Sequence, residues 1–185
     1  MALETSGSNL SGLIQLIRED WVAHGRDWTR PGFRAVAVHR IGQWRMGIKP
    51  KLLRAPFSIL YRAMFRRICR AYGIELPYTV TLGRRVILEH QHGIVIHGNC
   101  VIGDDCIIRQ GVTLGNKSVA TRFEAPRLGN RVDVGAGAKV LGPVFVGDDA
   151  VVGANAVVVR DVPAAATAVG VPARIIKRTG QGASR

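Results

Sequence analysis

Residues 94–115 read IVIHGNCVIGDDCIIRQGVTLG, and residues 128–160 read LGNRVDVGAGAKVLGPVFVGDDAVVGANAVVVR. In both stretches an aliphatic residue returns every six positions, first at Ile96, Ile102, Ile108 and Leu114, then at Leu128, Val134, Val140, Val146, Val152 and Val158. A second row lies two positions earlier and consists mostly of small residues, among them Cys100, Cys106, Ala138, Ala150 and Ala156. The repeating unit is aliphatic-Gly-x-x-x-x over much of this region.

A period of six fits neither the 3.6 residues of a helix nor simple strand alternation, and short fixed repeats are typical of solenoids. If each hexapeptide forms one short strand and one turn, three of them make a coil, and the aliphatic residues of successive coils stack into a core. A β-sandwich with Gly-rich turns is the alternative, but it requires alternation at period two. We therefore predict a mainly β protein built on a parallel β-helix.

Three amphipathic helices are expected before the repeat. Asn9 or Ser11 is placed to cap the first, Pro31 lies at the first turn of the second, and the third runs from Lys51 to about Tyr72 and ends at Gly73. The third is expected to bury Leu53, Phe57, Leu60, Tyr61, Met64, Phe65 and Ile68. These helices are expected to cover the open end of the β-helix, where strand edges are otherwise unpaired. The chain thus divides into a helical region (1–74), a β-helix domain (75–177) and a flexible tail (178–185).

The charge is concentrated in the helical region. The chain has 26 Lys and Arg against 13 Asp and Glu, and no acidic residue lies between Asp27 and Glu75. A solvated helical face is the simplest interpretation; peripheral contact with an anionic membrane surface and attraction of a polyanionic ligand such as coenzyme A are the functional ones. Nucleic-acid binding is not expected, because no reading module is present and aromatics are only 6% of the residues.

The cysteines and the first residues bear on location. Three cysteines are too few for a disulfide framework, and Cys100 and Cys106 are expected to be buried thiols in the small-residue row. The first residues lack the pattern of a signal peptide, and no segment is apolar enough to span a membrane. We therefore expect a cytoplasmic protein, with peripheral contact at the inner membrane face left open.

The repeat is interrupted twice, and each interruption shifts its phase by two residues. The first break is LEHQHG, residues 88–93, and the second runs from Asn116 to Pro126, which is long enough to leave the solenoid as a loop. Residues that depart from a rigid ladder are held at a fixed place beside it. The breaks are therefore where we expect the chemistry.

Five segments together resemble the serine O-acetyltransferases: LEHQHGIVI (88–96), QGVTLG (110–115), VGAGAKVLG (134–142), ANAVVVRDVP (154–163) and VGVPAR (169–174). The resemblance extends from Gly73 to about Lys177. It implies a left-handed parallel β-helix, a homotrimer or a dimer of trimers, and transfer of acetyl from acetyl-CoA to a hydroxyl. No metal is required for that reaction.

The resemblance also implies roles for individual residues. His90 matches the catalytic histidine, which would act as general base on the acceptor hydroxyl, and His92 is the reserve base. Glu75 matches the aspartate that orients it, one methylene longer. The family's coenzyme A groove corresponds here to Gly115, Ala136, Lys139, Ala154, Arg160 and Arg174. A histidine whose only role is a satisfied polar contact is the alternative for His90, and we retain that interpretation for His97.

Two departures from the family concern the acceptor. Glu89 replaces the aspartate that grips the amino group of serine, and Glu124-Ala125-Pro126 replaces Arg-His-Pro. A substrate carboxylate beside Glu124 would be repelled where the family offers a bidentate cation; Arg122 on a shifted loop is the alternative source of that charge. Serine is therefore the family default but is expected to be a poor substrate, with a sugar hydroxyl of a surface polysaccharide as competitor. A non-catalytic trimeric scaffold is the second alternative.

Overall fold

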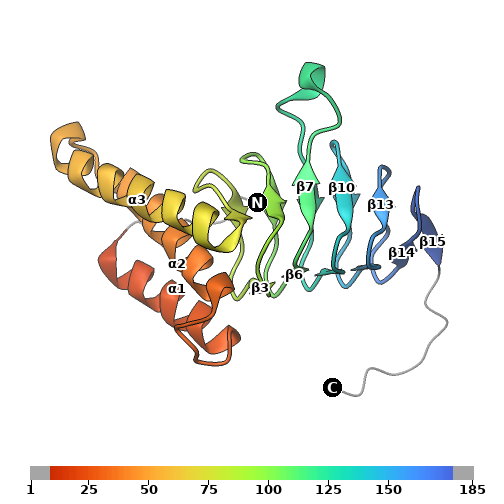
Figure 1. The fold of residues 1–185 in the computed structure, drawn as a ribbon, viewed down its shortest axis with the longest axis horizontal. Helices are drawn as coiled ribbons and strands as arrows, with labels where there is room; N and C mark the ends of the chain where they lie inside the picture. The colour runs from red at the N-terminus through yellow and green to blue at the C-terminus, as the bar shows by residue number, and fades with distance from the viewer. Residues whose placement is uncertain (1–8, 177–185) are drawn as a thin grey trace.

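The computed structural model describes residues 9–176, and the predicted tail lies outside the described residues. Three helices lie at one end of a β-helix whose coils advance towards the C-terminus (Figure 1). This arrangement confirms the predicted fold class. Within the described residues, no helix combines the length and the apolar character needed to cross a membrane.

Local sequence signals set the ends of the helices. Helix α1 (Leu10–Ala23) begins at Asn9, whose side chain accepts a hydrogen bond from the backbone N–H of Gly12 at 2.8 Å. Helix α2 (Pro31–Trp44) begins with proline, which has no N–H to leave unsatisfied. After the short η1 (Arg45–Gly47), helix α3 (Lys51–Tyr72) ends at Gly73, which adopts the left-handed conformation that glycine tolerates best.

The strands form three sheets that run along the β-helix. The first contains β1 (Ile74–Glu75), β4 (Ile94–Ile96), β7 (Thr113–Gly115), β10 (Lys139–Leu141) and β13 (Val157–Val158). The second contains β2 (Thr81–Leu82), β5 (Val101–Ile102), β8 (Arg127–Leu128) and β11 (Phe145–Val146). The third contains β3 (Ile87–Glu89), β6 (Ile107–Arg109), β9 (Asp133–Val134), β12 (Val151–Val152), β14 (Thr167–Val169) and β15 (Arg174–Ile176). Neighbouring strands pair in parallel, except β15, which pairs antiparallel with β14.

The two residue rows read from the sequence form the core. Ile96, Ile102, Ile108 and Leu114 are buried, as are Cys100 and Cys106 in the second row. Burial raises the pKa of the Cys100 thiol to about 12 and that of Cys106 to about 11, so both are protonated at neutral pH. The prediction that they are buried thiols is confirmed.

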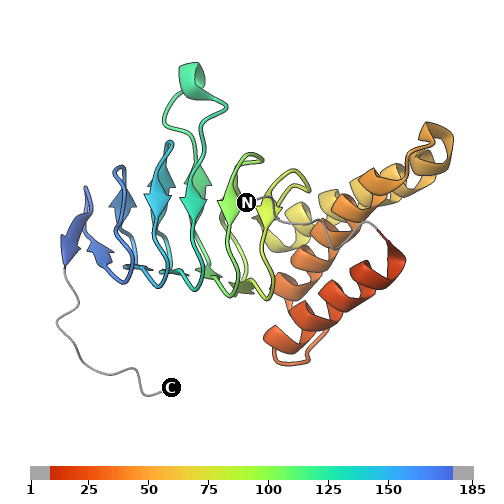
Figure 2. The same ribbon diagram turned by 180° about the vertical axis from the view of Figure 1, so that it is seen from behind.

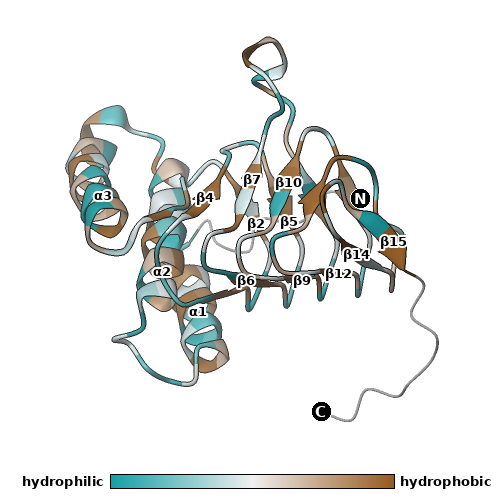
Figure 3. Ribbon diagram, turned by 45° about the vertical axis from the view of Figure 1, so that its right-hand side comes forward, coloured by the Kyte–Doolittle hydropathy of each residue, from teal (hydrophilic) through white to brown (hydrophobic). Residues whose placement is uncertain are grey.

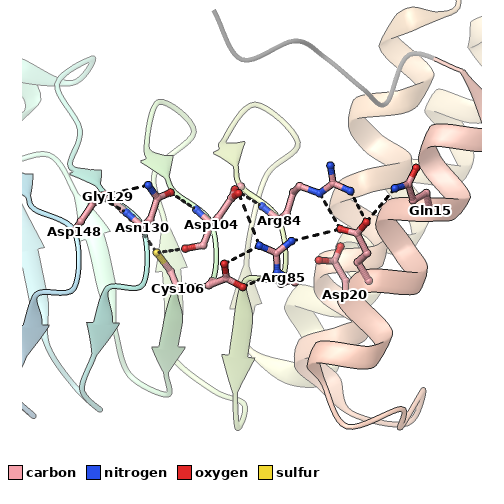
Figure 4. Close-up of polar contacts among 12 residues, drawn as sticks. Gln15, Asp20, Arg84, Arg85, Asp104, Cys106, Gly129, Asn130 and Asp148 are labelled. Carbon is pink, nitrogen blue, oxygen red and sulfur yellow. Dashed lines mark hydrogen bonds and ion pairs between the residues drawn. The ribbon is translucent and has the colours of Figure 1, made fainter. Parts of the chain in front are cut away.

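The turns of successive coils are also joined by side chains. The Asp104 carboxylate accepts from the backbone N–H of Arg84, the Asn130 side chain from that of Asp104, and the Asp148 carboxylate from that of Asn130, each at 2.8–2.9 Å (Figure 4). This ladder runs towards the helices, because the Arg84 guanidinium binds Glu19 of α1. Register between coils is thus fixed by polar contacts as well as by the core.

Helix α2 closes the first coil of the β-helix. A Cβ on Gly32 would lie 1.9 Å from the carbonyl oxygen of Leu88, so only glycine permits this approach. Buried Arg40 donates to the carbonyl oxygen of Leu82 at 2.9 Å and to Asp20 of α1 at 2.9 Å. The helices therefore cover the end of the solenoid, as predicted (Figure 2).

The prediction for the buried face of α3 is wrong in part. Tyr61 and Ile68 are buried, but Leu53 and Leu60 are more than half exposed and Phe57 is only partly covered. Figure 3 shows apolar and polar segments side by side along this helix. The first half of α3 therefore presents apolar side chains to its surroundings.

Candidate active site

His90 lies in the turn between β3 and β4, where the repeat gains two residues. The backbone is left-handed at His90, His92 and Gly93, with φ of 66°, 72° and 73°. Two hydrogen bonds hold the turn: the N–H of His92 donates to the carbonyl of Tyr72 at 2.7 Å, and its carbonyl accepts from Gly111 at 3.0 Å. The His90 side chain itself is exposed, so a base at this position would be accessible to an acceptor.

Glu75 lies on β1, with its side chain exposed, and Val95 is its register partner on β4. Among the described residues, no hydrogen bond joins Glu75 to His90. The structure thus places both residues on the first two coils without a hydrogen bond between them. The assignment of Glu75 as the group that orients His90 remains a prediction.

Glu89 is held in a chain of charges on the third sheet. Its carboxylate lies 3.0 Å from the Arg109 Nε, and the Arg109 guanidinium also binds Asp133. Asp133, and then Glu89, hold the pKa of Arg109 above its usual value. The residue predicted to bind an amino group is therefore already paired with a cation.

Arg109 was missed by the sequence reasoning. Glu89 and Arg109 are register partners on β3 and β6, one coil apart. Aligning the third strand of each coil would have placed them together. Asp133 lies on β9, the neighbour of β6 in the next coil, as the partner of Ile107 and so diagonal to Arg109. The useful signal is the complementary charge at equivalent positions of successive coils.

The second break forms a loop that leaves the β-helix between β7 and β8 and stands well clear of it (Figure 1). It contains the short η2 (Val119–Thr121) and is tied to the solenoid where the Asn99 side chain donates to the carbonyl of Phe123 at 2.9 Å. The Arg122 guanidinium lies over the Phe123 ring, 4.8 Å from its centre. Glu124 is exposed, and within the described residues it forms no ion pair with Arg122.

The residues expected to line the cofactor groove lie mostly on one side of successive coils. Gly115 ends β7, and Lys139 begins the neighbouring β10, where its ammonium group donates to the carbonyl of Gly111. Ala136 and Ala154 occupy equivalent turns, because the residue after Ala154 donates its N–H to the Ala136 carbonyl at 2.8 Å. Ala154 is exposed and Ala136 partly exposed, whereas Gly115 is buried.

Two further groove residues lie at the end of the solenoid. Arg160 follows β13 and Arg174 begins β15, and both side chains are exposed. Across residues 9–176, no three His, Cys, Asp or Glu side chains are grouped so as to hold a metal ion. The surface depression next to α1, lined by Gln15, Glu19 and Arg85 among others, includes none of the predicted site residues.

Comparison with known proteins identifies the family. A serine acetyltransferase from Helicobacter pylori is 40% identical over 170 residues, which are 90% of this chain and 95% of that protein. This chain belongs to the serine acetyltransferase family. Another serine acetyltransferase, from Synechococcus elongatus, is 40% identical over 154 residues, but this chain spans only 59% of its length, and 61% of a relative from Mycobacterium tuberculosis. No family model matches the sequence.

Solved serine acetyltransferases share the fold. The enzyme from Brucella abortus in complex with coenzyme A aligns with a TM-score of 0.79 at 29% identity, covering 96% of this chain and 72% of that one. The enzyme from Neisseria gonorrhoeae in complex with serine aligns with a TM-score of 0.73 at 29% identity, covering 92% and 71%. The family resemblance predicted from the five sequence segments is thus confirmed.

Proposed function

We propose that this protein is an acetyl-CoA-dependent O-acetyltransferase whose acceptor is L-serine. The observation that carries the proposal is the 40% identity to the Helicobacter pylori serine acetyltransferase over 95% of that protein's length. The exposed His90, on a turn fixed by backbone hydrogen bonds, is consistent with a base that acts on a substrate from solvent.

In the proposed reaction His90 accepts the proton of the serine hydroxyl as the oxygen attacks the thioester carbonyl of acetyl-CoA. The C–S bond then breaks, and the coenzyme A sulfur takes the proton from the imidazolium, so the histidine returns to its neutral form. Glu75 would favour the imidazolium if substrate binding brings the two side chains together. His92, also exposed in the same turn, is the reserve base.

Coenzyme A is proposed to lie along the strip of Gly115, Ala136 and Ala154, with Lys139, Arg160 and Arg174 close to its phosphates. Support comes from the lack of bulky side chains on this strip and from the basic residues towards its C-terminal end. The coenzyme A complex of the Brucella abortus relative agrees with this choice of ligand. Lys139 would have to exchange its bond to the Gly111 carbonyl for one to the ligand.

A homotrimer, or a dimer of trimers, is part of the proposal. Both His90 and Glu75 are exposed in the isolated chain, so a second wall is needed to exclude water from the reaction. A neighbouring β-helix would supply that wall. A cytoplasmic location is proposed together with the activity.

A neutral sugar hydroxyl is the second candidate acceptor. Glu124 would repel a substrate carboxylate. The ion pair with Arg109 offsets the charge of Glu89 and so weakens its attraction for an amino group. Both features weaken the binding of a zwitterion and leave a neutral hydroxyl unaffected. A shift of Arg109 towards the substrate carboxylate would reverse this argument, since Glu89 and Arg109 could then bind the two ends of serine.

The test is the release of free thiol from acetyl-CoA with L-serine or with a series of neutral hexoses as acceptor. A kcat/KM for serine of about 10⁴ M⁻¹s⁻¹ or more supports the serine proposal. Transfer to a hexose with serine inactive would replace it with the second candidate. No transfer, and no thermal stabilisation by coenzyme A, would favour the scaffold; a ligand at 100 times its Kd stabilises by about 2.7 kcal/mol.

The role of His90 is tested by substitution. His90→Ala is expected to lower turnover by about 10²–10⁴-fold while coenzyme A affinity, measured by calorimetry, stays the same. His97→Ala is the matched control and should keep its activity, because the His97 ring only accepts a hydrogen bond from the Asn99 N–H, at 3.2 Å. Full activity in His90→Ala together with its loss in His92→Ala would move the role to His92.

A further inference from the structure

Helix α3 has one covered face and one uncovered face. Tyr61 and Ile68, seven residues apart, are 4% and 7% exposed, and the Tyr61 ring packs edge-on against Tyr78 at 5.4 Å between ring centres. The uncovered side, which we call the outer face of α3, is made of two rows at seven-residue spacing. Leu52, Ile59 and Arg66 lie opposite Tyr61, and Leu53, Leu60 and Arg67 lie on the flank between.

The apolar side chains of the outer face are largely exposed to solvent. Leu52 is 89% exposed, Ile59 64%, Leu53 63% and Leu60 52%. Neighbouring large apolar side chains that remain in water mark a site of interaction with a protein or a membrane. This part of α3 lies at the end of the molecule farthest from the last coil of the β-helix (Figures 1 and 2), where another body can reach it.

The outer face becomes basic in the second half of the helix. Arg66 and Arg67 continue the two rows, and Arg62 and Arg70 lie beside them. Within residues 9–176, Arg66, Arg67 and Arg70 form no ion pair, and α3 contains no acidic residue. The face therefore combines an apolar half with an unneutralised cationic half.

We propose that the outer face of α3 docks onto an anionic lipid bilayer. Leu52, Leu53, Ile59 and Leu60 enter the boundary of the acyl chains, and the arginines of the second half contact lipid phosphates. An amphipathic helix with this composition binds in the plane of a membrane surface through apolar burial plus attraction to anionic lipids. The interaction is peripheral, because α3 is too polar to cross the membrane.

A second copy of the same face is a poorer occupant. A symmetric, antiparallel contact would place the cationic half of each α3 against the apolar half of the other, and α3 has no acidic residue to neutralise the arginines. Two acidic side chains of the β-helix turns are already neutralised, because Asp105 is paired with Arg85 and Asp149 with Arg131. A nucleic acid would match the charge but would leave the leucines uncovered.

The docking proposal is independent of the acceptor, since none of these residues belongs to the proposed active site. It assigns the basic helical region a specific ligand and a specific face. It also predicts that the protein concentrates at anionic membranes without a lipid anchor.

The experiment is flotation of the full-length protein with phosphatidylcholine vesicles that contain or lack phosphatidylglycerol. Binding is expected only with phosphatidylglycerol and is expected to weaken as NaCl rises. Leu52→Asp should lower the vesicle partition coefficient by about tenfold or more, the order expected when one buried leucine is lost. Arg66→Glu combined with Arg67→Glu should lower it by at least about tenfold.

The matched controls are on α1, where Val22 is an exposed apolar residue and Arg18 an exposed cation. Val22→Asp and Arg18→Glu should bind vesicles as the wild type does. Equal loss in these controls, or no dependence on phosphatidylglycerol in the wild type, would overturn the proposal.

Light scattering of the lipid-free variants tests whether the outer face is instead a contact between subunits. Leu52→Asp should keep the wild-type oligomeric state and thermal unfolding, because its side chain is free. A smaller oligomer would show that the outer face is a contact between subunits and would overturn membrane docking. Duplex DNA binding that is as tight as vesicle binding and unchanged in Leu52→Asp would overturn it as well.

Discussion

In the β-helix, the row of aliphatic residues that includes Ile102, Ile108 and Leu114 is buried along its length, whereas α3 leaves Leu52, Ile59 and Leu60 largely in water. Each coil of the β-helix rests on another coil of the same pattern, so the position within the hexapeptide determines what faces inward. A helix has no such neighbour built into its sequence. Its apolar residues show that it packs against something, but not which of two faces does so.

The largest effect is expected from the ion pair that is buried within the helical region. Asp20 and Arg40 are both buried, and the Arg40 Nε lies 2.9 Å from the Asp20 carboxylate. Asp20→Ala therefore leaves a guanidinium without a counterion inside the helical region. The expected loss in the free energy of unfolding is about 3–5 kcal/mol, measured by urea denaturation at fixed protein concentration. Combining Asp20→Leu with Arg40→Met should recover much of that loss, because no unpaired charge remains. A loss below about 1 kcal/mol in Asp20→Ala would mean that water reaches the pair.

The second prediction compares one leucine from each region directly. Leu114→Ala removes a fully buried side chain of the β-helix and should lower the free energy of unfolding by about 2–5 kcal/mol. Leu60→Ala removes a side chain that is more than half exposed and should change it by less than about 0.5 kcal/mol. Similar losses in the two variants would indicate that another subunit covers the outer face of α3.

The sequence predicted the β-helix core and the helix ends but not which face of α3 is covered. The hexapeptide rows, the buried Cys100 and Cys106, and the helix ends at Asn9 and Gly73 were predicted, because each depends on local conformation or on a repeated position. The exposure of Leu53 and Leu60 was not, because it depends on where α2 meets α3. His90 and Glu75 remain predictions as catalytic residues.

Contacts between residues distant in the sequence were also missed. Arg40 finds Asp20 on another helix and the carbonyl of Leu82 on the first coil, at sequence separations of 20 and 42. Arg109 binds Glu89 across one coil, and its charge bears on the choice of acceptor. Pairs of this kind emerge only after the coils have been stacked in register.

The third prediction concerns acid, which should destabilise the helical region through His39. Burial, followed by the charge of Arg40, lowers the pKa of His39 to about 3. The Nε2–H donates to the Val80 carbonyl at 3.0 Å, and the buried Nδ1 has no hydrogen-bond partner among residues 9–176, so a second proton would be an uncompensated charge. Below pH 6.5 the unfolded chain binds this proton and the folded protein does not, so stability falls as the pH falls.

The expected change is about 1–2 kcal/mol between pH 6.5 and 5, since one proton of difference corresponds to about 1.4 kcal/mol per pH unit. His39→Gln keeps a donor for the Val80 carbonyl and should reduce the slope. Part of the slope should remain, because burial also lowers the pKa of His24. An unchanged slope in His39→Gln would assign the acid sensitivity to other groups.

The smallest change in the free energy of unfolding is expected from an exposed Arg–Asp ion pair on the β-helix. Arg85 and Asp105 form a bidentate pair across one coil at 2.6 and 2.7 Å, which is tighter on distance alone than the Asp20–Arg40 pair. The arginine lowers the pKa of Asp105, but both side chains remain substantially exposed, so water and salt screen the attraction. Asp105→Asn should therefore change the free energy of unfolding by less than about 1 kcal/mol, and by even less at high salt. Urea denaturation of this variant and of Asp20→Ala shows whether burial or distance determines the contribution of an ion pair to stability. A loss in Asp105→Asn as large as that in Asp20→Ala would show that the turns of the β-helix are more shielded than the isolated chain indicates, as they would be if another subunit packed against them.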